Sequence, residues 1–291
     1  MAKDQKHHYV PQCYLNHFAK DGHIYCYSKK RRQHNYNAVE DICQSKYFYL
    51  ITEKSWWTQF EIEKDFFSHS VEANMNMMIN VIEKSVQNAL HGQSSSERLI
   101  IREGTRRTIA TMIFIQFYRT PRFRRFYSDK IITRKGISSI THEYTEEKVT
   151  DKVMVHALAT YLNKELLRKT VDYLLNNRWI IRYSEDDVFL TSDNPVVWIP
   201  LREKNTDIIT LENIGERRCF LYYPITPHIV LEIYDKDTKN LSPDFDNLVI
   251  RCDTDREYFL NINTIINADD LVILRNKDID LYSLNIDLTI M

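Results

Sequence analysis

Apolar residues in this chain of 291 residues repeat with two different periods, and the change of period limits the folds that it can adopt. Residues 23–39 alternate aromatic with polar side chains around a turn-prone centre, as a β-hairpin does. Residues 56–177 carry apolar side chains three and four positions apart, which is the period of an amphipathic helix. Short β-like runs return after residue 178. Strands toward both ends and helices between them favour an α+β fold over a regular alternation of strand and helix.

Three helical regions are predicted in the central part. The first starts near Trp56 and stops at the polar stretch HGQSSSE, residues 91–97. The second begins after Ser96, a good N-cap residue, and ends before Thr120 because a proline disfavours helix at the residue preceding it. The third spans about residues 146–177. We therefore expect a central helical bundle.

The strands expected outside the bundle are short. A helix between the last two strands is expected to start with a cap at Asp253 or Thr254 and to end near Asn267. The strand candidates are the hairpin, KYFYL at 46–50, the runs within 179–199, HIVLEIY at 228–234 and LVIL at 271–274.

We predict a single domain over residues 1–291. Residues 1–50 form an extended N-terminal segment, residues 56–177 are helical and residues 178–291 are rich in sheet. In this α+β fold a central helical bundle packs with an N-terminal hairpin and a C-terminal antiparallel or mixed sheet.

Composition indicates a globular protein in a reducing compartment. Only five glycines and seven prolines stand against eighteen tyrosines and thirteen phenylalanines, which favours regular, well-packed structure. No apolar run approaches the roughly 20 residues that cross a bilayer, and the first residues lack the apolar core of a signal peptide. The five cysteines form no CxxC pair, so neither a disulfide framework nor a zinc site is indicated. We expect a cytoplasmic protein with no membrane partner.

Charge is unevenly distributed although the net charge is only −1. Residues 98–135 hold eleven Lys and Arg against two acidic residues, whereas residues 184–291 hold ten against twenty-one. The two blocks either create a basic face for phosphates or attract each other within the fold.

The opening stretch KHHYVPQCYLNHF, residues 6–18, is the first candidate for a site. Adjacent residues of an extended segment point to opposite faces, so we expect only one of His7 and His8, preferably His8, to face a cleft. An imidazole can serve as general acid, general base, metal ligand or phosphate partner. The alternative is a histidine that fixes the N-terminal segment.

Two further stretches carry polar residues in unusual places. Gln116 and Arg119 follow the apolar run IATMIFI and share its inward face, so each needs a buried partner or an anion. The turn LTSDNPVVW, residues 190–198, places Asp193 at the end of a strand, where it is either a functional carboxylate or an ordinary Asx-turn residue.

The acidic residues of FEIEKDFFSHSVE, residues 60–72, are weaker candidates. Glu63 and Glu72 lie nine residues apart, so a straight helix does not place them on one face. Solvated positions on an amphipathic helix are the more common role for such residues.

These stretches together resemble a largely bacterial family, domain of unknown function 4238. Cys13 stands where an aromatic residue is more usual, and Glu63 and Glu72 match only loosely. The resemblance rests on an HHYVPQ-type box (His7 to Gln12, then Tyr14, Leu15 and Phe18), a QxxRTP-type segment (Gln116 to Pro121) and a TSDNPV-type turn (Thr191 to Val196), with weaker matches at Pro224, Thr226-Pro227 and Asn263 to Ala268.

The resemblance implies that the boxes form one cleft rather than a particular reaction. Families of this kind look similar to accessory proteins of mobile elements and phage defence, in which nucleases are common effectors. We therefore expect a phosphodiesterase or nuclease that acts on nucleic acid or a nucleotide, as a defence or toxin-like effector.

In this hypothesis His8 is the general acid–base, Arg119 holds a phosphate and Asp193 orients His8 or a metal ion. A Mg²⁺ or Mn²⁺ ion would need Glu63 or Glu72 beside Asp193, because one carboxylate supplies too few ligands. Aromatic rings among the arginines of residues 118–127 would stack on bases. The expected substrate-binding residues are His7, Gln116, Thr120, Ser192 and Asn194.

Two other functions fit the same residues. A non-catalytic sensor would hold a nucleotide or small anion in the cleft and contact a partner protein of a defence system through its sheet-rich half. An enzyme that cleaves the glycosidic bond of a nucleotide would release free base.

Overall fold

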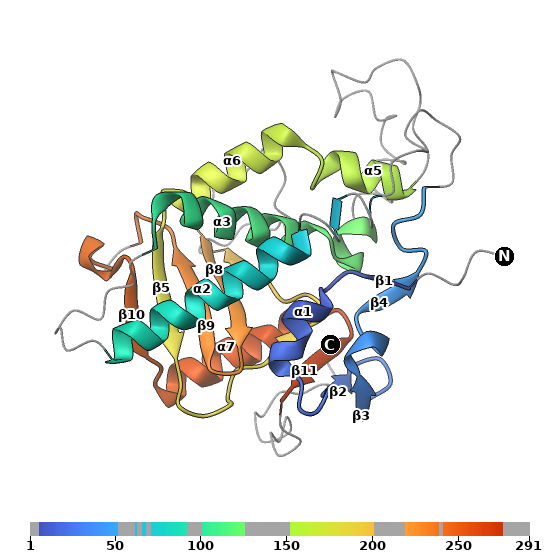
Figure 1. Cartoon of the computed structure of the whole chain (residues 1–291), viewed down its shortest axis with the longest axis horizontal. Coiled ribbons are helices and arrows are strands. Elements are labelled where there is room, and N and C mark those ends of the chain that lie inside the picture. Colours follow the sequence, from blue (N-terminus) through green and yellow to red (C-terminus); the bar gives the residue numbers. More distant parts are fainter. Residues whose placement is uncertain are drawn as a thin grey trace.

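The computed structural model describes residues 6–51, 62, 66–67, 71–91, 101–125, 152–200, 219–238 and 241–275. Helices occupy its middle and strands lie toward both ends of the sequence, which confirms the α+β class (Figure 1). The helices are α1 (Gln12–Leu15), α2 (Glu72–His91), α3 (Glu103–Tyr118), α5 (Lys152–Ala159), α6 (Lys164–Leu175) and α7 (Thr254–Asn267), with 3-10 turns at Asn16–Phe18, Val39–Asp41 and Pro243–Phe245. The strands are β1 (Lys6–His8), β2 (His23–Ser28), β3 (Gln33–Ala38), β4 (Gln44–Lys46), β5 (Arg178–Tyr183), β6 (Thr191–Ser192), β7 (Val197–Pro200), β8 (Cys219–Thr226), β9 (Ile229–Tyr234), β10 (Leu248–Arg251) and β11 (Leu271–Leu274).

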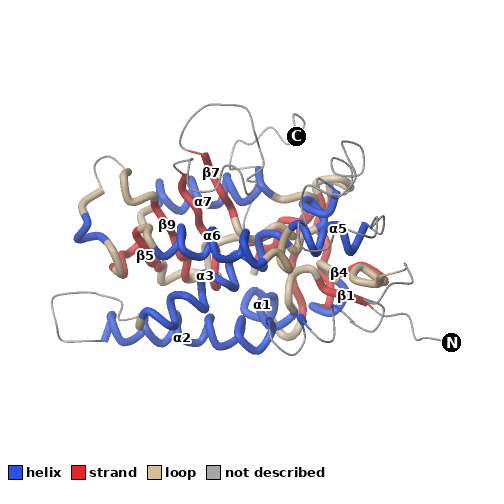
Figure 2. The backbone as a smooth tube through the Cα atoms, turned by 90° about the horizontal axis from the view of Figure 1, so that it is seen from above, coloured by secondary structure: helices blue, strands red, loops and turns tan. Residues whose placement is uncertain are grey.

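The larger sheet has the strand order β10-β5-β9-β8-β7 and is mixed, because β10 is parallel to β5 and the other pairs are antiparallel. Alternate residues of β8 face opposite layers. Leu221 and Tyr223 join the main core, while Tyr222 donates its hydroxyl to the Leu260 carbonyl of α7 at 2.7 Å. Figure 2 shows α7 and α2 on opposite sides of these strands. Both faces of the sheet are therefore covered.

The smaller sheet joins the two ends of the described chain. Its strand order is β3-β2-β11-β6, so the N-terminal hairpin pairs with a strand from the C-terminal part. β11 lies between β2 and β6 and is antiparallel to both. This arrangement brings the turn after β6 close to the N-terminal segment.

Helix α3 is the central helix of the bundle. Its second half is buried on nearly every side, as expected for a helix with apolar residues all round. It contacts α2 and α6, and Arg106 near its start lies 4.8 Å from the ring centroid of Trp179 in β5. The polar groups at its C-terminal end are consequently kept away from water.

The predicted helices and strands differ from the structure in specific ways. The third helical region is two helices, because Asn163 caps a new start by accepting a hydrogen bond from the Leu166 amide at 3.0 Å. KYFYL is mostly a turn, with Tyr47 in the left-handed region at φ 57°. Strands β8 and β10 were not predicted. The expected helical start near Trp56 and the cap at Ser96 lie outside the described residues. Parts of the predicted single domain lie outside them too, so the single domain stays a prediction.

The basic and acidic blocks attract each other. Arg106 of α3 makes two hydrogen bonds of 3.1 Å to the carboxylate of Asp246, and Arg125 pairs with Asp269. Part of the basic block is thus used inside the fold.

Among the described residues, no helix combines the length and the apolar character needed to cross a membrane. Four of the five cysteines are free thiols: Cys13, Cys26, Cys43 and Cys252.

Candidate functional site

The C-terminal end of α3 carries three fully buried polar side chains, those of Gln116, Arg119 and Thr120. Arg119 is the C-cap residue, and its amide still donates to the Ile115 carbonyl at 3.0 Å. A cation at this end of a helix is stabilised by the helix dipole. The predicted inward orientation of Gln116 and Arg119 is confirmed.

The guanidinium of Arg119 is only partly paired. Nε donates to the Tyr49 hydroxyl at 3.2 Å, and Nη2 donates to the His8 carbonyl. The group also lies 4.0 Å from the ring centroid of Phe67, which is a cation–π contact. Among the described residues Nη1 has no hydrogen-bond partner and no carboxylate forms an ion pair with the group. Burying a charge without such compensation costs on the order of several kcal/mol.

Two more buried atoms beside Arg119 are unpaired within the described part of the chain. Gln116 donates from Nε2 to the Tyr9 carbonyl at 3.1 Å, but its Oε1 has no partner. The hydroxyl oxygen of Thr120 has none either. We call Gln116, Arg119 and Thr120 the Arg119 cluster. It offers hydrogen-bond donors to an anion and one acceptor to a hydroxyl or amide group.

The two histidines have different partners. His7 accepts a hydrogen bond from the Tyr49 amide at Nδ1, 2.9 Å away, and stacks on the Tyr49 ring with 5.8 Å between centroids. It therefore positions the tyrosine that bonds Arg119. The His8 ring contacts the Gln12 amide nitrogen at 3.3 Å, and burial, aided by the charge of Arg119, lowers its pKa. Burial thus favours the neutral form of the His8 imidazole.

Glu72 and Cys13 lie on the α2 side of the cluster. Burial raises the pKa of Glu72, and the charge of Arg119 opposes this effect. Burial also raises the pKa of Cys13 to about 11, so this thiol is not a thiolate nucleophile at neutral pH. Glu63, the other carboxylate predicted to bind a metal, lies outside the described residues.

Asp193 is buried and bonded to backbone. Oδ1 accepts from the Asp269 amide at 2.8 Å, and Oδ2 accepts from the amides of Asp270 and Leu271 at 2.8 and 2.9 Å. Burial raises the pKa of Asp193 to about 6, although these three donors oppose the shift. The carboxylate fixes the turn before β11, and its hydrogen bonds go to that turn rather than to His8.

The residues next to Asp193 complete what we call the Asp193 turn, residues 192–194. The Ser192 hydroxyl accepts from the Asn194 amide at 3.1 Å. Asn267 donates to the Asn194 carbonyl at 2.9 Å, and Arg122 donates to the side-chain oxygen of Asn267 at 2.9 Å. Arg122 follows Arg119 by three residues, so the end of α3 contacts both the N-terminal box and the Asp193 turn.

Sequence reasoning missed several residues of this arrangement. Tyr49 and Phe67 belong to aromatic-rich stretches that gave no sign of contact with an arginine. Arg122 and Asn267 had a signal, because one follows the QxxRTP segment directly and the other lies in the weak family match at Asn263–Ala268. The rings predicted to stack on bases are buried where described, at Tyr118 and Phe123.

The metal prediction has little support from this geometry. The described residues hold no group of three or more His, Cys, Asp or Glu side chains arranged to bind a metal. An ion at Asp193 would also share its oxygens with three backbone amides. Within the part of the chain that the structure describes, the donors at Asp193 do not fit a Mg²⁺ or Mn²⁺ centre.

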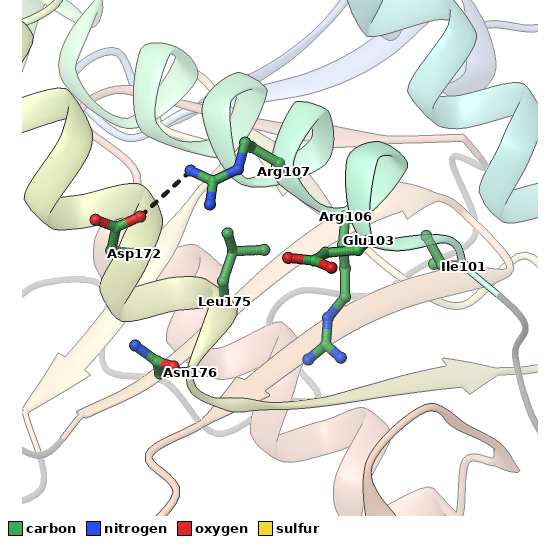
Figure 3. Close-up of a pocket in the computed structure, with 7 residues that line it drawn as sticks. All are labelled: Ile101, Glu103, Arg106, Arg107, Asp172, Leu175 and Asn176. Atoms are coloured by element: carbon green, nitrogen blue, oxygen red, sulfur yellow. Dashed lines mark hydrogen bonds and ion pairs between the residues drawn. The ribbon is translucent and has the colours of Figure 1, made fainter.

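A cavity of about 460 Å³ lies near the start of α3 (Figure 3), and its lining includes none of the predicted site residues. Arg107 and Asp172 approach each other beside it at 3.2 Å, between α3 and α6. Its lining is Ile101, Glu103, Arg106, Arg107, Asp172, Leu175 and Asn176.

Comparison with known proteins identifies one family. The family model described as protein of unknown function (DUF4238) matches residues 6–278, so the chain belongs to this family. Neither curated proteins nor solved structures give a significant match.

Proposed function

We propose that this member of the DUF4238 family binds a phosphate-bearing ligand, a nucleotide or a nucleic acid, through Arg119. The observation that carries the proposal is the incomplete pairing of a fully buried guanidinium. Arginine matches phosphate through planar, bidentate hydrogen bonds. Charge interacts more strongly away from water, so a phosphate oxygen at Nη1 would offset the cost of burying the cation.

The neighbours of Arg119 suit a phosphate ester better than a bare anion. Thr120 can donate its hydroxyl to a second phosphate oxygen. Gln116 Oε1 accepts only, so it suits a sugar hydroxyl or a base amine. Since Arg119 is fully covered, binding requires the side chains of Tyr49 and Phe67 to move away from the guanidinium.

Calorimetric titration with inorganic phosphate, AMP, ATP and a 5′-phosphorylated dinucleotide tests the proposal. Arg119→Met is expected to weaken binding of the preferred ligand at least tenfold, and Arg119→Lys to restore part of it because the charge returns without the planar fork. Arg107→Met is the matched control, since Arg107 lies on the same helix but is exposed and paired with Asp172. Equal affinity in Arg119→Met and wild type, or no binding by wild type, would contradict the proposal.

Hydrolysis of a phosphodiester is a second candidate, favoured by the state of His8. Burial favours its neutral imidazole, the form that accepts a proton, and its backbone carbonyl accepts from Arg119 at the proposed phosphate site. An unrestrained nuclease would also act as a toxin-like effector in defence.

Labelled RNA and DNA, incubated with the protein with and without Mg²⁺ or Mn²⁺, test this candidate. Cleavage that His8→Ala abolishes while phosphate binding persists supports hydrolysis, and His91→Ala at the exposed C-terminal end of α2 is the control. Intact nucleic acid under every condition contradicts hydrolysis and leaves the binding function. Release of free base would instead identify cleavage of a glycosidic bond.

A further inference from the structure

The N-terminal hairpin presents aromatic rings on an exposed sheet edge. β3 is the edge strand of the smaller sheet, at the lower right in Figure 1. Tyr25 lies opposite Tyr36 and Tyr27 lies opposite His34, so these side chains share one face. Ile24 and Cys26 point to the other face and are fully buried. One face of the hairpin packs against the core, and the other face is exposed along β3.

The exposed rings form a continuous surface. Tyr36 is 50% exposed, stacks on His23 with 4.9 Å between centroids and 21° between planes, and lies 4.4 Å from Tyr25. Tyr27 is buried because it packs with residues of α7, including Ile265. The exposed rings are therefore those of His23, His34 and Tyr36, and Tyr25 is half-buried between them and the cluster that α7 covers.

A basic turn, residues 29–32, connects the two strands. Lys29 is used by the fold, because its ammonium donates to the Ala268 carbonyl at the end of α7 at 2.8 Å. Lys30 lies 3.8 Å from Asp269. Arg31 and Arg32 are exposed, and neither guanidinium has an ion pair or hydrogen bond with any of the residues described. Two arginines at the end of a ring surface are thus available to an anion.

We propose that this hairpin face binds single-stranded nucleic acid, with bases stacked on Tyr36 and Tyr25 and the backbone phosphates held by Arg31 and Arg32. Exposed rings bordered by cations are the general means by which proteins hold single strands, because every base has a face that can stack. The unpaired guanidinium groups match a polyanion. A protein strand added to β3 would use its backbone groups but would leave these charges unmatched. The inference is independent of the phosphate site at Arg119.

Fluorescence anisotropy with a labelled twelve-residue oligo-dT or oligo-U measures the interaction in the full chain. Tyr36→Ile keeps a β-branched residue suited to the strand but removes the ring, and it is expected to weaken binding about tenfold. Arg31→Ala combined with Arg32→Ala is expected to weaken binding and to reduce the slope of log Kd against log salt by about 1.4, because each phosphate contact on a single strand contributes about 0.7.

Matched controls separate this surface from other effects. Tyr258→Ala removes an exposed ring from the N-terminal half of α7, and Arg168→Ala with Lys169→Ala removes two exposed charges from α6; both are expected to bind like wild type. Hairpin variants are also expected to bind phosphate at Arg119 with wild-type affinity. The oligonucleotide measurement therefore tests the hairpin proposal alone, and the phosphate titration tests the Arg119 proposal alone. The inference is overturned if wild-type protein does not bind the oligonucleotide at low salt, or if it dimerises along β3 instead. So does equal loss of affinity in the control variants.

Discussion

The Asp193 carboxylate and the Arg119 cluster are both buried and both polar, but they differ in how completely their atoms are paired. The carboxylate of Asp193 accepts three backbone hydrogen bonds, which satisfies the start of β11. The Arg119 cluster leaves a nitrogen, an amide oxygen and a hydroxyl without partners among the residues described. A completely paired group serves the fold, whereas unpaired buried groups retain capacity for a ligand.

Removal of the Asp193 carboxylate should have the largest effect on stability. Asp193→Ala leaves three buried amides without an acceptor, and we expect the free energy of unfolding to fall by about 4 kcal/mol. Urea denaturation measures the change. Asp172→Ala removes an exposed, ion-paired carboxylate and should cost no more than about 0.5 kcal/mol. A similar small cost for Asp193→Ala would mean that its hydrogen bonds do not fix the turn.

Arg106 provides the paired counterpart of Arg119 on the same helix. Arg106→Met breaks the two hydrogen bonds to Asp246 and the one to the Asn177 carbonyl, and we expect a loss of about 3 kcal/mol in the same measurement. Double replacement with Asp246→Ala should cost less than the sum of the single changes, because the pair acts as a unit. Strict additivity would exclude coupling between the two residues.

His156 extends the comparison to pH. Burial, together with the charge of Arg124, lowers the pKa of His156 to about 3, and its Nε2 contacts the Tyr118 carbonyl at 2.7 Å. The unfolded chain protonates near pH 6.5 while the folded protein does not, so stability is lost as pH falls below 6.5. We expect this residue to contribute about 2 kcal/mol of loss between pH 7 and pH 5. His156→Gln keeps a donor for the carbonyl and should remove that part of the pH dependence, and an unchanged pH profile would contradict the assignment.

Arg119 itself should affect stability least. Arg119→Met removes the bonds to Tyr49 and His8 but also removes a charge that is costly to bury, so we expect a change within about 1 kcal/mol. Chemical denaturation beside the ligand titration separates the two roles. A loss as large as that of Arg106→Met would identify Arg119 as a structural residue and would remove the contrast between the two regions.

Features that depend on local chemistry, such as helix caps and helix ends, were predicted most clearly from the sequence. Asp253 caps α7 by accepting from the Arg256 amide at 2.8 Å, and α7 ends at Asn267 as expected. KYFYL failed as a strand because Phe48 and Tyr49 turn inward to arginines, with Arg124 lying 3.4 Å from the Phe48 ring centroid. β8 was missed because it is buried on both faces and contains Pro224, so it shows no alternation.

The burial of the candidate site residues was predictable from the sequence, but their bonding partners were not. Family boxes identified Gln116, Arg119 and Asp193, and the structure brings their segments to the end of α3. Whether a buried group is paired depends on tertiary contacts such as those of Tyr49 and Asn267, which no local pattern contains. The same limit applies to the hairpin, where alternation indicated the strands but not which rings α7 would cover.

The position of β11 has a consequence for biosynthesis. β2 pairs with β11, a strand that is synthesised more than two hundred residues after it. Until β11 is made, the core that covers Ile24 and Cys26 is incomplete, and the edge of β2 opposite β3 has no strand partner. The nascent hairpin therefore lacks this partner while the intervening residues are synthesised, and contacts so distant in sequence slow the final assembly.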